Sequence, residues 1–175
     1  MADIDRRQGS PVPENMVSKY KDMLDGTHAL VVAADVLDTW RVGRTADITL
    51  NNSNKTFVVP AGQEWQVLWV KVWYEASSEN GNRQLEVRVE DGGDVVVGTW
   101  ARAACVIAAD TQREFCFGAG LADILAYRDT DYATTPMPNG SMLMAGDVLR
   151  VWDRAEIDAG VDDMIVFVQI AWRAV

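Results

Sequence analysis

Residues that commonly carry catalysis are scarce in this chain of 175 residues. Histidine occurs once, as His28, at the start of an apolar stretch and without a matching Ser, Cys or Asp motif. The GxSxG, HExxH and P-loop patterns are all absent from the sequence. We therefore predict a protein that is not an enzyme and that holds no cofactor or metal.

Basic residues are also in the minority. Lys and Arg number 16 against 26 Asp and Glu, which gives a net charge of −10. Such a balance argues against nucleic-acid binding, which requires a basic face, and against anionic membranes. It is typical of solubility at high concentration, and complementarity to a basic partner is the alternative.

Long apolar runs are missing as well. No stretch approaches 18 apolar residues, so no membrane span is predicted. The N-terminal residues lack the apolar segment of a secretion signal, and we expect the protein to fold in a cytoplasm.

Cysteine is limited to Cys105 and Cys116, which form neither a CxxC motif nor a metal cluster. A disulfide between them and two buried thiols are both open, and folding in a cytoplasm favours thiols. Three acidic clusters match no EF-hand loop, and we interpret them as turns or solvated loops rather than calcium sites. They are Glu90–Asp94, Asp129–Asp131 and Asp158–Asp163.

The chain is rich in alternating apolar and polar residues, the pattern of β-strands. Gln63–Glu75 is the strongest case and is apolar on both predicted faces. One face would carry Trp65, Val67, Trp69 and Trp73, and the other Leu68, Val70, Val72 and Tyr74. A strand that is apolar on both faces is central or covered, so this strand indicates a subunit contact.

Shorter alternating runs predict further strands. They are Gln84–Glu90, Val95–Trp100, Arg113–Phe117, Asp147–Asp153 and Met164–Trp172. Turn signals at Glu79–Asn82 and Asp91–Asp94 predict that Gln63–Glu75 and the next two strands form a meander. Together these signals predict an all-β, jelly-roll-like β-sandwich of about eight antiparallel strands.

Two short segments resemble each other, Val59–Gln63 and Leu143–Asp147. In each, an apolar residue leads into an Ala-Gly-polar sequence and then into a strand. Glycine supplies the backbone freedom that a sharp bend requires. We predict that these segments are corners where the chain passes from one sheet to the other.

Residues 1–26 differ from the rest because they are polar and contain Pro11 and Pro13. We predict an extended N-terminal arm followed by a sandwich domain of residues 27–175. Stretched out, the arm would span about 85 Å at about 3.3 Å per residue. A short helix is expected around Glu14–Leu24. A disordered terminus and an assembly arm that reaches a neighbouring subunit both stay open.

Six residues are the candidates for assembly contacts: Arg6, Arg7 and Tyr20 from the arm, and Trp69, Trp73 and Tyr74 from the long strand. Aromatic side chains are enriched where proteins meet. Trp side chains also stack on sugars, so a carbohydrate-binding sandwich is an alternative, although burial in a core or an interface is favoured.

The stretch from Val58 to Val168 resembles a group of small structural proteins of tailed bacteriophages. The resemblance is carried by VVPAGQEWQVLWVKVWYEAS, GNRQLEVRVEDGGDVV, FGAGLADILAYRDTDYATTPMP and MAGDVLRVWDRAEIDAGVDDMIVFVQI. It implies a jelly-roll sandwich that is part of the virion and is often oligomeric.

The expected function is that of a head decoration, or cement, protein on the capsid surface. Its partners would be the major capsid protein and further copies of itself, as a homotrimer. A tail, neck or baseplate component is the first alternative. A carbohydrate-binding module and a depolymerase enzyme are the others.

Overall fold

The computed structural model describes residues 20–22, 28–30, 40–121, 131–140 and 142–175. The chain divides into two units, Met1–Thr39 and Trp40–Val175, whereas the sequence placed a boundary after residue 26. In the first unit, β1 (Tyr20–Asp22) pairs antiparallel with β2 (His28–Leu30). Three residues of the helix expected around Glu14–Leu24 thus lie in a strand.

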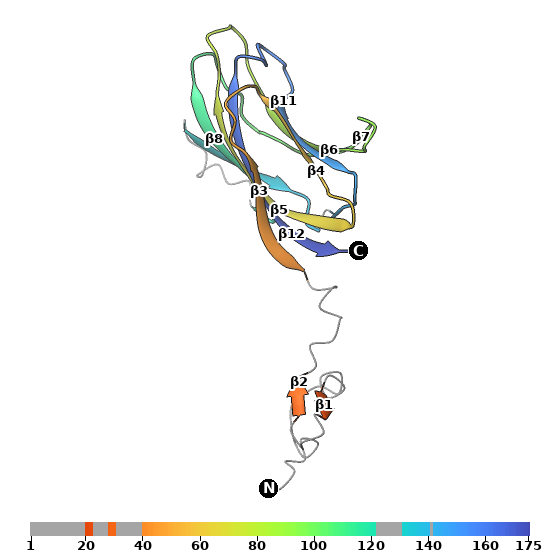
Figure 1. Ribbon diagram of the computed structural model, residues 1–175. Coiled ribbons are helices and arrows are strands. Elements are labelled where there is room, and N and C mark those ends of the chain that lie inside the picture. Colours follow the sequence, from red (N-terminus) through yellow and green to blue (C-terminus); the bar gives the residue numbers. More distant parts are fainter. Residues whose placement is uncertain (1–19, 23–27, 31–39, 122–130, 141) are drawn as a thin grey trace. The chain divides into compact units, whose positions relative to one another are not determined.

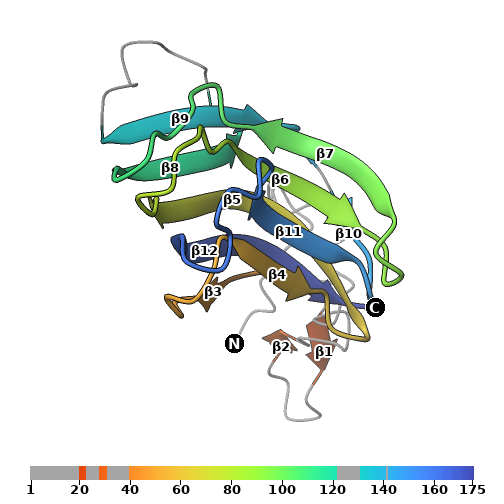
Figure 2. The same cartoon turned by 90° about the horizontal axis from the view of Figure 1, so that it is seen from above.

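The second unit is a sandwich of two β-sheets (Figures 1 and 2). In the larger sheet the strand order is β3-β12-β5-β8-β9, with β10 also paired to β5; in the smaller it is β4-β11-β6-β7. The larger sheet comprises β3 (Arg41–Asp47), β5 (Gln63–Glu75), β8 (Gln112–Ala119), β9 (Tyr132–Met137), β10 (Met142–Leu143) and β12 (Asp163–Ala174). The smaller comprises β4 (Asn54–Val58), β6 (Leu85–Glu90), β7 (Val96–Arg102) and β11 (Val148–Asp153).

The predicted all-β sandwich is therefore confirmed, while its jelly-roll topology stays a prediction. In the described part of the chain, no helix is long and apolar enough to cross a membrane. Neighbouring strands are antiparallel except β8 and β9, which are parallel. Parallel neighbours require a crossover connection, which here comprises residues 120–131.

The core lies between the sheets and follows the period of two that the sequence shows. Leu85, Val87 and Val89 of β6 point inward as predicted, and all three are buried. Phe115 and Phe117 of β8 face them from the larger sheet, with ring centroids 6.2 Å apart. Each such side chain contributes about 1.5–3 kcal/mol of hydrophobic stabilisation.

A β-bulge in β5 overturns the predicted faces of that strand. Gln169 of β12 pairs with Trp69, but the next residue, Ile170, pairs with Val67, so Leu68 is an extra residue. A bulge shifts the alternation of a strand by one residue. Trp65 and Val67 consequently lie on the core face, which after the bulge carries Val70, Val72 and Tyr74. Trp69 and Trp73 lie on the outer face, so the predicted grouping of all three Trp on one face is wrong.

Deletion of Leu68 should leave the sandwich folded. Removing the extra residue restores regular alternation without turning Trp65 or Trp69 to the wrong face, so we expect a loss on the order of 1 kcal/mol. Deletion of Lys71 is the matched control, because it would move Trp69 into the buried position of Val70 and cost more than about 3 kcal/mol. Urea unfolding of both variants measures the difference, and equal losses would contradict this account of the bulge.

The two predicted corners are confirmed. Residues 59–62 connect β4 of the smaller sheet to β5 of the larger, and residues 144–147 connect β10 of the larger to β11 of the smaller. Gly62 and Gly146 adopt positive φ values of 73° and 92°. The corners also bond to one another, because Gly146 N donates to Val59 O at 3.0 Å and Val59 N to Asp147 O at 2.9 Å.

The predicted meander is half right. β6 and β7 pair as expected, but β5 and β6 lie in different sheets. The connection contains Gly81 at φ 146° and Arg83, which forms a bridge with Ile107. The Asn-Gly signal identified a turn, but this turn leads from one sheet to the other, and Arg83, which follows it, is fully buried.

Arg83 anchors this connection through a buried ion pair with Asp162. Its Nε donates to Asp162 Oδ2 at 3.1 Å, and its Nη1 donates to the carbonyls of Glu79 and Gly81 at 2.7 and 3.0 Å. Tyr74 donates its hydroxyl to the same carboxylate at 2.5 Å. Arg83 and Asp162 have side chains that are 0% exposed, so their charges compensate one another inside the protein.

Candidate interaction surface

The outer face of the larger sheet carries a cluster of apolar side chains, here called the outer patch: Trp69, Trp73, Ile165 and Phe167. The register of β5 and β12 sets Trp73 directly beside Ile165. Phe167 is beside Lys71, between the two Trp positions of β5. All four side chains reach solvent in part, and Phe167 is 36% exposed. Four adjacent large apolar side chains on one sheet face are typical of a protein contact.

Charged groups lie within and around the outer patch. Lys71 and Glu114 form an ion pair across β5 and β8, with 2.9 Å between Nζ and Oε2. Both side chains are more than 40% exposed, so this pair adds little to folding stability. Arg44 is on the same face, beside Gln169. Apolar anchors with a polar rim form the usual composition of a protein interface.

A pocket of about 310 Å³ opens beside Trp69. Gly118 pairs with Trp69, and a Cβ at Gly118 would lie 2.6 Å from Leu121 Cδ1, so the glycine makes room for that side chain. Burial raises the pKa of the Cys116 thiol in the pocket wall, although the Tyr132 hydroxyl bonds to it. Cys105 and Cys116 are both free thiols, as favoured from the sequence, but both are partly rather than fully buried.

The outer face of the smaller sheet is different because it is built from ion pairs. Arg88 stacks on Trp152, with its guanidinium 4.0 Å from the ring centroid. Glu90 is fully buried between Arg88 and Arg150, and its Oε2 is 2.9 Å from Arg150 Nε. These charged side chains already form ion pairs within the chain. The outer face of the smaller sheet therefore offers a partner fewer charged groups to bind.

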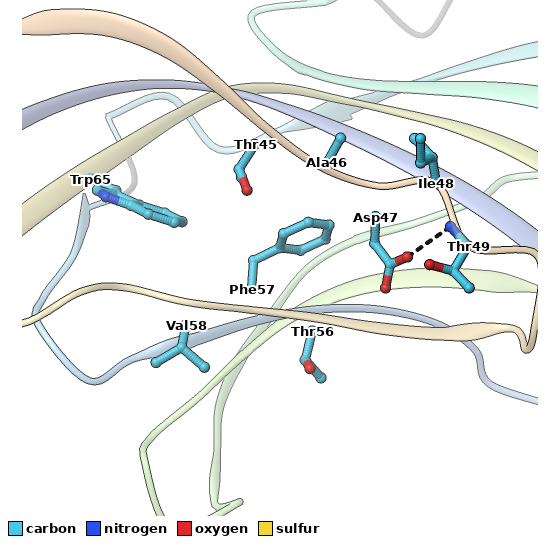
Figure 3. A pocket seen from close by; sticks show the side chains of 9 residues that line it. All are labelled: Thr45, Ala46, Asp47, Ile48, Thr49, Thr56, Phe57, Val58 and Trp65. Carbon is cyan, nitrogen blue, oxygen red and sulfur yellow. Dashed lines mark hydrogen bonds between the residues drawn. The ribbon is translucent and has the colours of Figure 1, made fainter.

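A second pocket, of about 480 Å³, lies between β3 and β4, the edge strands on one side of the sandwich. We call it the edge groove. Figure 3 shows Thr45 of β3 pointing toward β4, and Phe57 of β4 pointing toward β3. Trp65 also lines the groove, and both aromatic residues are less than 8% exposed. The groove therefore has an apolar floor and a polar rim.

Lys55 of β4 connects β4 to the end of β3 and the residues after it through contacts with three polar groups. Its buried ammonium donates to Thr49 O at 2.7 Å and to Asn51 Oδ1 at 2.5 Å. It also lies 3.5 Å from Asp47 Oδ1. Burial opposes ionisation of Asp47, but the Thr49 N–H and the Lys55 charge hold the pKa of its carboxyl below the usual range. Lys55 thus holds the end of β3 against β4.

The six predicted contact residues are not brought together. Trp69 and Trp73 lie in the outer patch, but Tyr74 is fully buried and bonds to Asp162, so its side chain is not available to a partner. Tyr20 is in β1, and its side chain is not described. Arg6 and Arg7 lie outside the described residues. Trp73 stands beside Ile165 only through strand pairing, so no local signal identified β12 as the partner strand.

The acidic clusters serve as structural elements where they are described. Glu90 and Asp162 are buried in ion pairs, and Asp91 accepts hydrogen bonds from Gly93 N and Val95 N, each at 2.9 Å. Within the described ranges, no group of three His, Cys, Asp or Glu residues is placed to hold a metal ion. Asp129 and Thr130 lie outside those ranges.

No protein-family model matches this chain, and comparison with curated proteins found no significant match. The resemblance to phage structural proteins therefore stays a prediction.

Proposed function

We propose that this chain is a non-enzymatic structural protein of a tailed-phage virion, and specifically a head decoration protein that binds the major capsid protein. One observation carries the proposal: Trp69, Trp73, Ile165 and Phe167 form an apolar patch on a rigid sheet of a strongly acidic chain. The resemblance of Val58–Val168 to phage structural proteins supplies the setting.

The chemistry of the outer patch suits adhesion to another protein. Trp side chains in the centre of an interface commonly account for a large share of the binding free energy. The patch is held by paired strands of the larger sheet, so little conformational entropy is lost when a partner covers it. The net charge of −10 would steer the chain toward a basic surface.

A binding experiment with empty capsids tests the proposal. Capsids assembled without this protein would be mixed with the unmodified chain and with a Trp73→Ser variant, and bound chain would be counted after sedimentation. We expect the variant to bind about thirtyfold more weakly, the effect of losing one interface hot spot. Trp152→Ser is the matched control, since Trp152 lies on the outer face of the smaller sheet; it should bind like the unmodified chain.

Two results would contradict the proposal: no binding of the unmodified chain to capsids, or equal binding by the two Trp variants. Copy number separates the head from the tail, because hundreds of copies per virion indicate the shell and a few to tens indicate the tail, neck or baseplate. Density for the chain on the capsid surface in an electron cryomicroscopy map would decide the same question directly.

A carbohydrate-binding module is the second candidate function. It is favoured by the partial exposure of Trp69 beside the pocket of about 310 Å³, because an exposed indole can stack on a sugar ring. A glycan array that gives no signal with the unmodified chain would remove this candidate. Binding that is lost on Trp69→Ser would favour it over capsid decoration.

A further inference from the structure

The edge groove lies along β3, which among the described residues is paired on one side only. β3 pairs with β12 and forms the edge of the larger sheet, and β4 forms the nearby edge of the smaller. At the opposite side of the sandwich, β7 and β9 contact each other. An unpaired edge strand exposes backbone N–H and C=O groups that can bind another strand.

Exposed apolar side chains flank this edge on both sides. Val42 in β3, Ile48 and Leu50 after it, and Val58 in β4 are each more than half exposed. Single exposed apolar residues are ordinary, but four around one open sandwich edge form a surface that a partner would cover.

A segment of the first unit has the sequence of a strand that fits this edge. Residues 30–36 read LVVAADV, seven residues, the same length as β3. Leu30, Val32, Ala34 and Val36 alternate along it, so an extended conformation would place all four on one face. That face could lie over Phe57 and Trp65 in the groove.

We propose that residues 30–37 of one copy add as an antiparallel strand to β3 of a second copy. The inference rests on the proposed structural function and names the chain itself as a partner. The register that we infer sets Asp35 opposite Arg44, Ala33 opposite Ala46 and Leu37 opposite Val42. It pairs opposite charges and apolar residues on the outer face, and such cross-strand pairs stabilise a sheet.

A second copy is favoured over the same chain by the residues between the two segments. In the same register within one chain, Asp38–Arg41 would have to form a tight hairpin loop, and these four residues include no Gly, Asn or Pro. Within the chain, His28–Leu30 pair instead with Tyr20–Asp22. Strand addition from copy to copy is a heterologous contact, and a threefold rotation between copies would close it into the expected homotrimer.

A disulfide trap tests the register. In a background of Cys105→Ala and Cys116→Ala, one batch carries Ala33→Cys and another Ala46→Cys. Ala46 is exposed, and directly opposed strand residues lie close enough for a disulfide. We expect the mixed batches to give a disulfide-linked dimer after mild oxidation. Ala33→Cys mixed with Ala104→Cys is the control, because Ala104 is exposed beyond β7; this mixture should give none.

Two outcomes of the trap would overturn the proposal. One is the absence of a mixed dimer above the control. The other is an internally bonded monomer as the main product when Ala33→Cys and Ala46→Cys are in one dilute chain, which would mean that the segment pairs with its own β3.

The association of the full-length chain provides an independent readout. Val32→Asp would place a charge over Phe57 and Trp65, so we expect self-association in analytical ultracentrifugation to weaken at least about tenfold. Val31→Asp is the matched control on the other face of the segment, and it should weaken association less. A monomeric unmodified chain, or equal effects of the two variants, would overturn the inference. Neither result involves capsids, so a failure here is distinguishable from a failure of the proposed function.

Discussion

Replacement of Asp162 by Asn is expected to lower the free energy of unfolding by about 3–5 kcal/mol, the cost of breaking a fully buried ion pair. The Asn side chain keeps the shape of Asp162 but leaves the charge of Arg83 without its counter-ion inside the protein. It also weakens the hydrogen bonds that Tyr74 and Ser77 N donate to the carboxylate at 2.5 and 2.7 Å. Urea unfolding monitored by Trp fluorescence measures the change.

The neighbouring residue offers a matched control. Asp163→Asn removes the same charge at a partly exposed position and should change stability by less than about 0.5 kcal/mol. A similar loss in both variants would show that net charge, rather than the buried pair, is responsible.

The pH dependence gives a second check on the same pair. Burial opposes ionisation of Asp162, but Arg83, Tyr74 and Ser77 together hold the pKa of its carboxyl below the ordinary value of 3.8. A lowered pKa in the folded state adds stability that is present above the unfolded pKa and is lost as the pH falls through the folded pKa. The difference between Asp162→Asn and the unmodified chain should therefore be constant near neutral pH and should shrink below about pH 3.8. Asp153, whose pKa burial raises, titrates in both proteins.

Among the single-residue replacements, Glu90→Gln should produce the second largest loss of stability, about 2–3 kcal/mol. Glu90 is fully buried and neutralises both Arg88 and Arg150. The contacts are ion pairs without aligned hydrogen bonds, so a neutral amide does not replace them. The loss stays below that of Asp162→Asn because the two Arg side chains are 16–20% exposed and Arg150 also lies 3.7 Å from Asp94.

Glu86 provides the control on the same strand and face. It is also buried, but its partner Arg102 is 44% exposed and can turn to water when the charge is removed. Glu86→Gln should thus cost no more than about 1 kcal/mol in the same unfolding experiment. Equal losses for the two variants would mean that the exposure of the Arg partner does not matter here.

Local patterns predicted those parts of the fold that neighbouring residues decide. Alternation identified the inward residues of β6, and the Ala-Gly corners were recognised because a sharp bend depends on backbone freedom at Gly62 and Gly146. The bulge at Leu68 was not predictable in this way, because a bulge exists only relative to a paired strand. One extra residue was enough to exchange the faces of Trp65 and Trp69.

The candidate site likewise has parts that the local sequence predicted and parts that only strand pairing revealed. The sequence pointed to the strand Gln63–Glu75 as a contact, and two of its Trp side chains do lie on an outer face. It could not identify Ile165 and Phe167 as their neighbours, since these follow about 90 residues later and meet β5 only through the order of the sheet. Nor could it show that Tyr74 is held in the core by Asp162.

By itself, then, the sequence determined that this protein is built of β-strands, where its two corners lie and that it is acidic, because propensity, glycine placement and charge are local properties. Tertiary structure alone decided which strands share a sheet, which face of β5 is buried after Leu68, and where Arg83 meets Asp162. These depend on residues far apart in the chain, whose pairing is selected by the burial of the whole core rather than by any one segment.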